Sequence, residues 1–192
     1  MINSLPVKLI NFIHIVIFQI GWLVCAIFGN GYALAYSALY IALHFFLLQI
    51  RRRIDFTKEA LWLILFLVSG FIIETLFFSV GFLYFDEASA PSNSIITPII
   101  FPPLWLLCLW LLFGITMRTS MAFLFDKLWL AFLLIIIVIP LSYSVGAALN
   151  PDVSLGLPHF LSLPAITTAW VGFFGFILAL KHFYFGDLFN DR

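Results

Sequence analysis

The apolar run ALWLILFLVSGFIIETLFFSVGFLY, residues 60–84, decides the fold of this chain. About 20 consecutive apolar residues in helical form are enough to cross the ~30 Å hydrocarbon core of a bilayer, and this run exceeds that length. Its single charged residue is Glu74, which stands near the middle rather than at an end. The run predicts a membrane-spanning helix that carries one buried carboxyl group.

The composition of the whole chain agrees with a membrane location. Of 192 residues, 64% are hydrophobic and only 9% are charged, and the mean hydropathy is +1.16. Soluble domains contain roughly 25% charged residues. The formal net charge is zero, so nothing indicates a nucleic-acid partner or a polybasic lipid anchor. Cys25 and Cys108 both fall inside apolar runs, which argues against a disulfide framework.

Six apolar runs predict an all-α, polytopic membrane helix bundle with six transmembrane helices. The connectors between them are too short for a soluble domain, so residues 1–192 are expected to form a single integral membrane domain. The first run follows Lys8 as in a signal peptide, but it is long, contains polar residues and lacks a clear cleavage site, so we interpret it as a retained span. The predicted spans are about 7–28, 33–50, 60–84, 98–117, 128–149 and 160–180.

The lysine and arginine residues predict the orientation, because cytoplasmic loops carry an excess of both. In the six-span arrangement every one of them falls on one side, which a wrong number of spans would not produce. The opposite connectors carry only Asp86, Glu87 and Asp152. Both termini are therefore expected in the cytoplasm (N-in/C-in). The nine basic residues are Lys8, Arg51, Arg52, Arg53, Lys58, Arg118, Lys127, Lys181 and Arg192.

Glu74 is expected to lie roughly 21 Å from the cytoplasmic start of its span, somewhat beyond the membrane midplane. An ionised acid at such depth costs at least ~2.5 kcal/mol, so it is either protonated or partnered inside the bundle. Counting along the other spans places further polar and aromatic side chains near the same height, as a candidate binding or proton site. This predicted layer comprises Glu74, His44, Gln19, Ser142, Tyr143, Ser144, Thr167, Thr168, Trp105 and Trp110.

Each member of this layer also has a plainer interpretation. Serine and threonine in spans commonly form interhelical hydrogen bonds worth about 0.6 kcal/mol, and His44 alone is typical of a neutral packing histidine. Glu74 differs, because an intramembrane acid is an expensive way to join helices and indicates function. Pro140 and Pro164 interrupt two spans, and their kinks would either open an outward-facing pocket or only adjust packing.

Several chemistries are absent from the sequence. The four histidines form no cluster of the kind that di-iron membrane enzymes need, and no HExxH zinc motif occurs. No GxSxG motif, Cys/His dyad spacing or glycine-rich phosphate loop is present. No metal and no cofactor is expected, and whether the protein is an enzyme stays open.

Five features, taken in order, resemble a known family. They are NFIHIVIFQIGWLVC (11–25), His44, GFIIETLFFSVGFLYF (70–85), PLWLLCLWLLFGITMRTSMAFL (103–124) and PLSYSVGAAL (140–149). The chain resembles an uncharacterised family of short bacterial inner-membrane proteins, a domain of unknown function. Members are similar in carrying an acid, usually aspartate, at the position of Glu74. The resemblance implies a bacterial inner-membrane location and no established activity. Genes of the family that this chain resembles often neighbour genes for fatty-acid-modifying enzymes of the cyclopropane synthase kind. The resemblance therefore implies a link to membrane-lipid modification and a lipid-modifying enzyme as a partner.

Three functions stay open at this point. The first is a role in binding or presenting membrane lipids or fatty acids inside the bundle. The second is a small proton-coupled transporter or a substrate-binding membrane subunit, with Glu74 as the protonation site and Gln19, His44, Tyr143 and Thr168 along the path. The third is a non-catalytic assembly subunit in which the polar layer only holds helices together.

Overall fold

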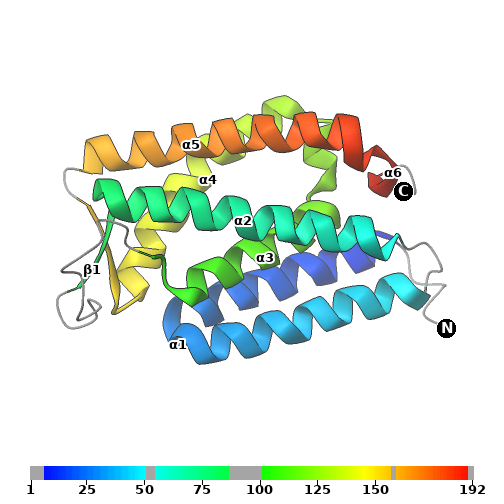
Figure 1. Ribbon diagram of the computed structural model, residues 1–192, viewed down its shortest axis with the longest axis horizontal. Helices are drawn as coiled ribbons and strands as arrows, with labels where there is room; N and C mark the ends of the chain where they lie inside the picture. The colour runs from blue at the N-terminus through cyan, green and yellow to red at the C-terminus, as the bar shows by residue number, and fades with distance from the viewer. Residues whose placement is uncertain (1–6, 51–54, 87–100, 157–158, 190–192) are drawn as a thin grey trace.

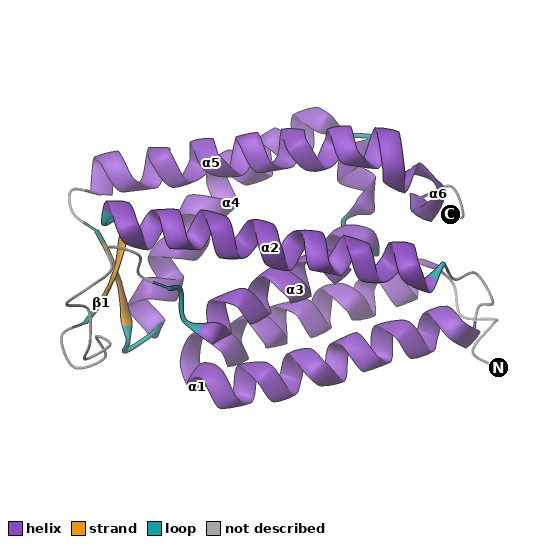
Figure 2. Ribbon diagram, in the orientation of Figure 1, coloured by secondary structure: helices purple, strands orange, loops and turns teal. Residues whose placement is uncertain are grey.

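The computed structural model describes residues 7–50, 55–86, 101–156 and 159–189. Within them the chain forms a helical bundle with one small two-stranded sheet at one end, as Figures 1 and 2 show. The predicted basic positions 51–53 and 192, Glu87 and residues 98–100 of the predicted span 98–117 lie outside the described residues. The elements are α1 (Val7–Ile50), α2 (Phe56–Val80), β1 (Leu83–Phe85), α3 (Leu104–Arg118), the 3₁₀ helix η2 (Ala122–Phe125), α4 (Leu128–Leu149), β2 (Val153–Leu155), α5 (His159–Leu180), the π-helical turn η3 (Lys181–Phe185) and α6 (Gly186–Phe189).

Helix α1 is a hairpin of two arms, 7–28 and 30–50, that fold back on each other at Gly29 (Figure 1). The Tyr36 hydroxyl in the second arm donates to the carbonyl oxygen of Ile17 in the first, at 2.7 Å. Gly29 has φ 73° and ψ −163°, a backbone region that is essentially restricted to glycine. The turn between the predicted spans 7–28 and 33–50 is thus made at Gly29.

Gly29→Ala is expected to destabilise the protein by about 1–3 kcal/mol, because alanine at this φ and ψ is strained although the space around the position is open. Gly31→Ala is the matched control, since Gly31 has no neighbour within 4 Å and lies outside the left-handed region. Unfolding of both variants in detergent checks the difference. Equal stability of the two variants would contradict the role assigned to Gly29.

Helix α2 begins and ends about four residues earlier than the predicted span 60–84. It begins at Phe56 after Asp55, whose carboxylate accepts a hydrogen bond from the Lys58 backbone at 3.1 Å, and it ends before Gly81. Leu83–Phe85 then pairs antiparallel with Val153–Leu155, so the prediction that the span is helical to residue 84 is wrong. Apolarity alone does not distinguish the end of a helix from a short buried strand.

Helix α3 is also shorter than the predicted span 98–117. It starts at Leu104, directly after Pro102 and Pro103. Proline disfavours a helical conformation in the residue before it, so the chain stays extended up to Pro103 and the helix begins only after it. Its 15 residues span about 22 Å. Nine of them are buried, against only two of the 22 residues of α4. Helix α3 is therefore the centre of the bundle and α4 is a peripheral wall.

Within the described residues, four helices are long and apolar enough to cross a membrane: Asn11–Gln49, Phe56–Val80, Leu128–Leu149 and His159–Phe189. Helices α4 and α5 match the predicted spans 128–149 and 160–180 to within one residue. Large apolar side chains are exposed along the outer faces, including Leu39, Ile72, Leu76 and Leu141. Such a surface is typical of a protein whose outer face meets lipid.

Basic side chains in the described residues gather at one end of the bundle through ion pairs. Lys58 at the start of α2 lies 2.6 Å from Asp187 of α6, and Lys181 of η3 lies 3.8 Å from Asp126. Helix α6 and the start of α2 lie at the same end of the molecule, opposite the sheet (Figure 1). Lys58 and Lys181 therefore lie at the same end of the bundle.

Candidate functional site

Glu74 of α2 is completely buried, with 0% of its surface exposed. Its Oε1 atom accepts two hydrogen bonds, one from Trp110 Nε1 of α3 at 3.0 Å and one from the Tyr143 hydroxyl of α4 at 2.5 Å. Its Oε2 atom has no hydrogen-bond partner within the described residues. A buried oxygen without a partner costs about 1–3 kcal/mol or more, so this arrangement leaves Glu74 with unused binding capacity.

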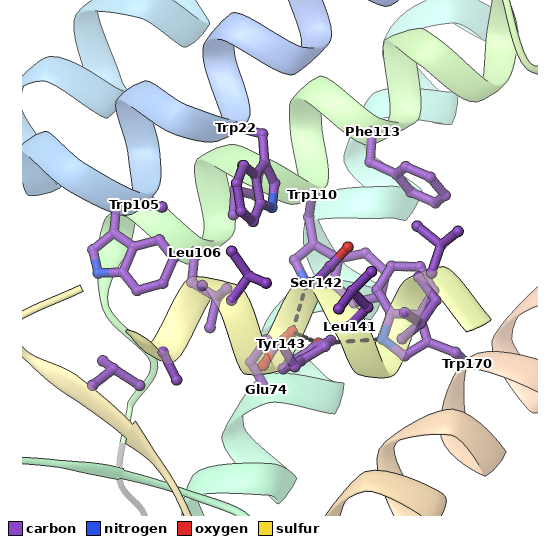
Figure 3. Close-up of a pocket in the computed structure, with 18 of the residues that line it drawn as sticks. Trp22, Glu74, Trp105, Leu106, Trp110, Phe113, Leu141, Ser142, Tyr143 and Trp170 are labelled. Carbon is purple, nitrogen blue, oxygen red and sulfur yellow. Dashed lines mark hydrogen bonds between the residues drawn. The ribbon is translucent and has the colours of Figure 1, made fainter. Parts of the chain in front are cut away.

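Tyr143 extends this arrangement to a fourth helix. The indole nitrogen of Trp170 in α5 donates to the Tyr143 hydroxyl oxygen at 3.2 Å. Trp110 and Trp170 also stack on each other, with ring centroids 4.6 Å apart and planes 15° from parallel. Figure 3 shows the side chains of Glu74, Tyr143, Trp110 and Trp170 close together and joined by hydrogen bonds. We call these four residues the Glu74 network, and it joins helices α2, α3, α4 and α5.

Trp110 reaches Glu74 because Gly70, one turn earlier on α2, leaves room for it. A Cβ atom at Gly70 would lie 2.2 Å from Cγ of the Trp110 ring. The small residue therefore brings the backbone of α2 against the indole, as small residues do at membrane helix interfaces. Gly70 and Glu74 are four residues apart and lie on one face of α2. Trp110 packs against Gly70 and donates its hydrogen bond to Glu74.

The Glu74 network forms the inner wall of a cavity of about 330 Å³. The first arm of α1 contributes Phe18 and Trp22, α3 contributes Trp105 and Phe113, and α4 contributes much of the opposite wall. Four of the six tryptophans of the chain line it: Trp22, Trp105, Trp110 and Trp170. Apolar walls with a few converging polar groups are characteristic of small-molecule sites.

The cavity reaches the outer surface between α1 and α4. Gln19, Val138, Leu141 and Val145 line it and are themselves exposed, so they form its rim. The surface beside this rim is apolar, since Ile20 and Leu23 of α1 and Ile137 of α4 are exposed as well. The rim therefore lies on a face suited to lipid rather than water.

Some predicted site residues meet here and others do not. Glu74, Tyr143, Trp105, Trp110, Gln19 and Ser142 all line the cavity. Ser144, Thr167 and Thr168 instead donate to carbonyl oxygens four residues back in their own helices, at 2.8–2.9 Å. These three hydroxyls are satisfied locally and the structure does not bring them to Glu74.

The prediction that His44 lies at the height of Glu74 is wrong. His44 Nε2 lies 3.5 Å from Glu59 Oε2, in a second buried polar group near the start of α2. The second arm of α1 runs back toward the end where the first arm begins, so a residue six positions before Ile50 lies only about 9 Å from that end. His44 consequently belongs to the opposite half of the bundle.

This second group contains residues that the sequence interpretation missed. Glu59 is 1% exposed, and its Oε1 atom accepts a hydrogen bond from Nε of Arg118 at 2.8 Å. Nη2 of Arg118 lies 2.8 Å from the same oxygen and forms an ion pair with it. Nearby, His14 Nδ1 lies 2.8 Å from the Tyr40 hydroxyl. A signal was present, since Glu59 is in the first turn of α2 and Arg118 in the last turn of α3, where helix dipoles favour those charges.

In the parts of the chain that the structure describes, no group of three or more His, Cys, Asp or Glu side chains is arranged to hold a metal ion. The chemical capacity of the Glu74 site is therefore that of one carboxyl group, held by two donors and set in an aromatic wall. It can bind a polar group of a ligand or exchange a proton; no nucleophile–base pair is formed in it by the residues described.

Comparison with known proteins places the chain in a family. No curated protein and no solved structure matches it. One family model does match, over residues 11–176, a range that includes most of α1, the Glu74 network and Arg118. The chain therefore belongs to the family described as "Protein of unknown function (DUF2878)".

Proposed function

We propose that this protein binds an amphipathic molecule of the membrane, such as a lipid or fatty acid, in the cavity beside Glu74. The apolar part of the molecule would lie against the aromatic and aliphatic walls, and its polar group would meet Glu74. The observation that carries the proposal is a fully buried acid with an unpartnered Oε2 atom at the inner wall of a cavity whose rim lies on an apolar surface.

The apolar rim supports entry of the ligand from the bilayer. A ligand dissolved in water would have to cross the lipid-suited face around Gln19 and Leu141 to reach it. A ligand already in the bilayer would reach the same opening by lateral diffusion. Burial of each methylene group contributes about 0.8 kcal/mol in an apolar environment relative to water, but far less relative to lipid. Selectivity then depends on the polar contact at Glu74.

We infer a six-crossing arrangement for this membrane protein, with both termini cytoplasmic in an inner membrane. The crossings would be the two arms of α1 together with α2, α3, α4 and α5. The ion-paired Lys58, Arg118 and Lys181 at one end of the bundle support this orientation, because basic residues favour the cytoplasmic side. A cysteine-labelling map of Lys58→Cys and Ser154→Cys in intact cells tests it; labelling of Lys58→Cys by an impermeant reagent would contradict it.

Filling the cavity tests the binding proposal. A Cβ atom at Gly146 would meet only Trp22 Cζ2, at 3.9 Å, so Gly146→Leu projects into the cavity without forcing the backbone apart. Mass spectrometry of molecules that co-purify with the protein should show at least about tenfold less bound ligand, a loss of about 1.4 kcal/mol. Gly172→Leu in α5 is the matched control, because Gly172 faces open space and does not line the cavity.

Glu74→Gln separates the alternatives that the sequence left open. Ligand binding predicts a folded variant with an altered set of co-purifying molecules. A proton-coupled transporter predicts a folded variant that loses coupled transport, and a purely structural role predicts lower stability with no change in bound molecules. Unchanged co-purification in both Glu74→Gln and Gly146→Leu would contradict the proposal.

A lipid-modifying enzyme as the partner that receives the ligand is part of the proposal, and lipid analysis of cells with and without the gene tests it.

A further inference from the structure

The charges around the cavity restrict the polar group that it accepts. Glu74 lines it, whereas none of the described lining residues is lysine, arginine or histidine. A phosphate or an ionised carboxylate placed there would face Glu74 with no counter-charge. A negatively charged group in a low-dielectric site needs a paired cation or several donors. The lining therefore disfavours anionic head groups.

The aromatic content of the wall is of the kind that recognises cations. Trp22, Trp105, Trp110 and Trp170 line the cavity together with Tyr143 and Phe113. Faces of aromatic rings attract ammonium groups through their quadrupole, most strongly for tryptophan, and a carboxylate among such rings adds a full counter-charge. A hydroxyl head group would gain only one hydrogen bond and ordinary apolar contact from the same wall.

The hydrogen bonds of Glu74 leave one atom for a ligand. Trp110 and Tyr143 both donate to Oε1, so Oε2 is the free acceptor. Glu74 has no exposed surface, and Tyr143 on the peripheral helix α4 is one of the two side chains bonded to it. Because Oε2 is buried, a ligand would reach it only after neighbouring side chains move.

We propose that the ligand is a lipophilic monocation, an amine or quaternary ammonium group with an apolar body, bound between Glu74 and the surrounding aromatic rings. This inference rests on the proposed function and narrows its ligand: the cavity stays the binding site, and a cationic amphiphile takes the place of an ionised fatty acid. The shared chemistry covers both a cationic amphiphile made by the cell and a foreign one taken up from outside.

Three ten-carbon probes with different head groups test the charge: decyltrimethylammonium, decanol and decanoate. Titration of the purified protein in a neutral detergent, followed by tryptophan fluorescence and calorimetry, should show the cation binding at least about tenfold more tightly than the other two. Glu74→Gln should bring the affinity for the cation down to that for decanol and leave the affinity for decanol unchanged. Gly146→Leu should weaken every probe that binds, and Gly172→Leu should weaken none.

The outcomes separate the two proposals. Equal or tighter binding of decanol or decanoate, with all binding sensitive to Gly146→Leu, would overturn the cation assignment and leave the cavity as the ligand site. No binding of any probe, or binding unaffected by Gly146→Leu, would overturn the proposed function itself. If Glu74→Gln does not fold, the ranking of the three probes on the wild-type protein decides the matter. Separate cationic extracts of the cell and of the growth medium then distinguish the source.

Discussion

Arg118→Met is expected to destabilise the protein by about 3–5 kcal/mol, the cost of leaving a buried charge without its partner. Glu59 is 1% exposed and the Arg118 side chain 13% exposed, and two nitrogens of Arg118 lie 2.8 Å from Glu59 Oε1. Methionine preserves much of the length of the arginine stem but offers no donor. The free energy of unfolding, measured by denaturant titration in detergent micelles, should fall accordingly.

Two controls identify the cause of that loss. The double variant Glu59→Gln/Arg118→Met should recover much of the lost stability, because no uncompensated charge then remains in the interior. Lys58→Met, which breaks the solvent-exposed pair with Asp187, should have little effect, since exposed ion pairs contribute little. Equal small effects of Arg118→Met and Lys58→Met would show that the Glu59–Arg118 pair is not the buried link we describe.

Gly70→Ala is expected to destabilise the protein by about 1–3 kcal/mol through overpacking at the interface of α2 and α3, and to disturb the Glu74 network as well. The added Cβ atom would meet three atoms of the Trp110 ring at 2.2–2.6 Å, and a ring cannot yield as a flexible chain end does. The indole must move, which breaks its hydrogen bond to Glu74 and its stacking with Trp170. Tryptophan emission and the unfolding free energy should therefore change together.

Gly175→Ala in α5 is the matched control, because its Cβ atom would have no neighbour within 4 Å. Alanine is favoured over glycine within a helix by up to about 1 kcal/mol, so this variant should be as stable as the wild type or slightly more stable. If Gly70→Ala were as stable as Gly175→Ala and kept the wild-type emission spectrum, the close packing of Trp110 against α2 at Gly70 would be contradicted.

The positions of the long helices could be predicted from the sequence because hydrophobicity is a local property. Helices α4 and α5 start and end within one residue of the predicted spans. The errors occur where local apolarity is ambiguous. Leu83–Phe85 is as apolar as the helix before it, and only its pairing with Val153–Leu155 makes it a strand. Helix α3 starts late because Pro102 and Pro103 prevent an earlier start.

The candidate site was predictable only in part, because counting residues along a helix gives a height but not a direction. Tyr143 and Trp110 lie at the height of Glu74 and also point toward it. Thr168 was predicted at the same height, but its side chain is exposed and bonds within its own helix. For His44 even the predicted height along the bundle was wrong, because the structure places it beside Glu59 and not beside Glu74.

The sequence by itself determined that this is a membrane protein, where its long helices lie and that Glu74 is the acid in the middle of one of them. Each of these follows from the composition of a single segment. The tertiary structure decided which side chains meet Glu74, that a cavity lies beside it and that Glu59 and Arg118 form a buried pair. Those facts depend on how each helix is rotated and how closely neighbours approach, which small residues such as Gly70 set through packing rather than through hydrophobicity.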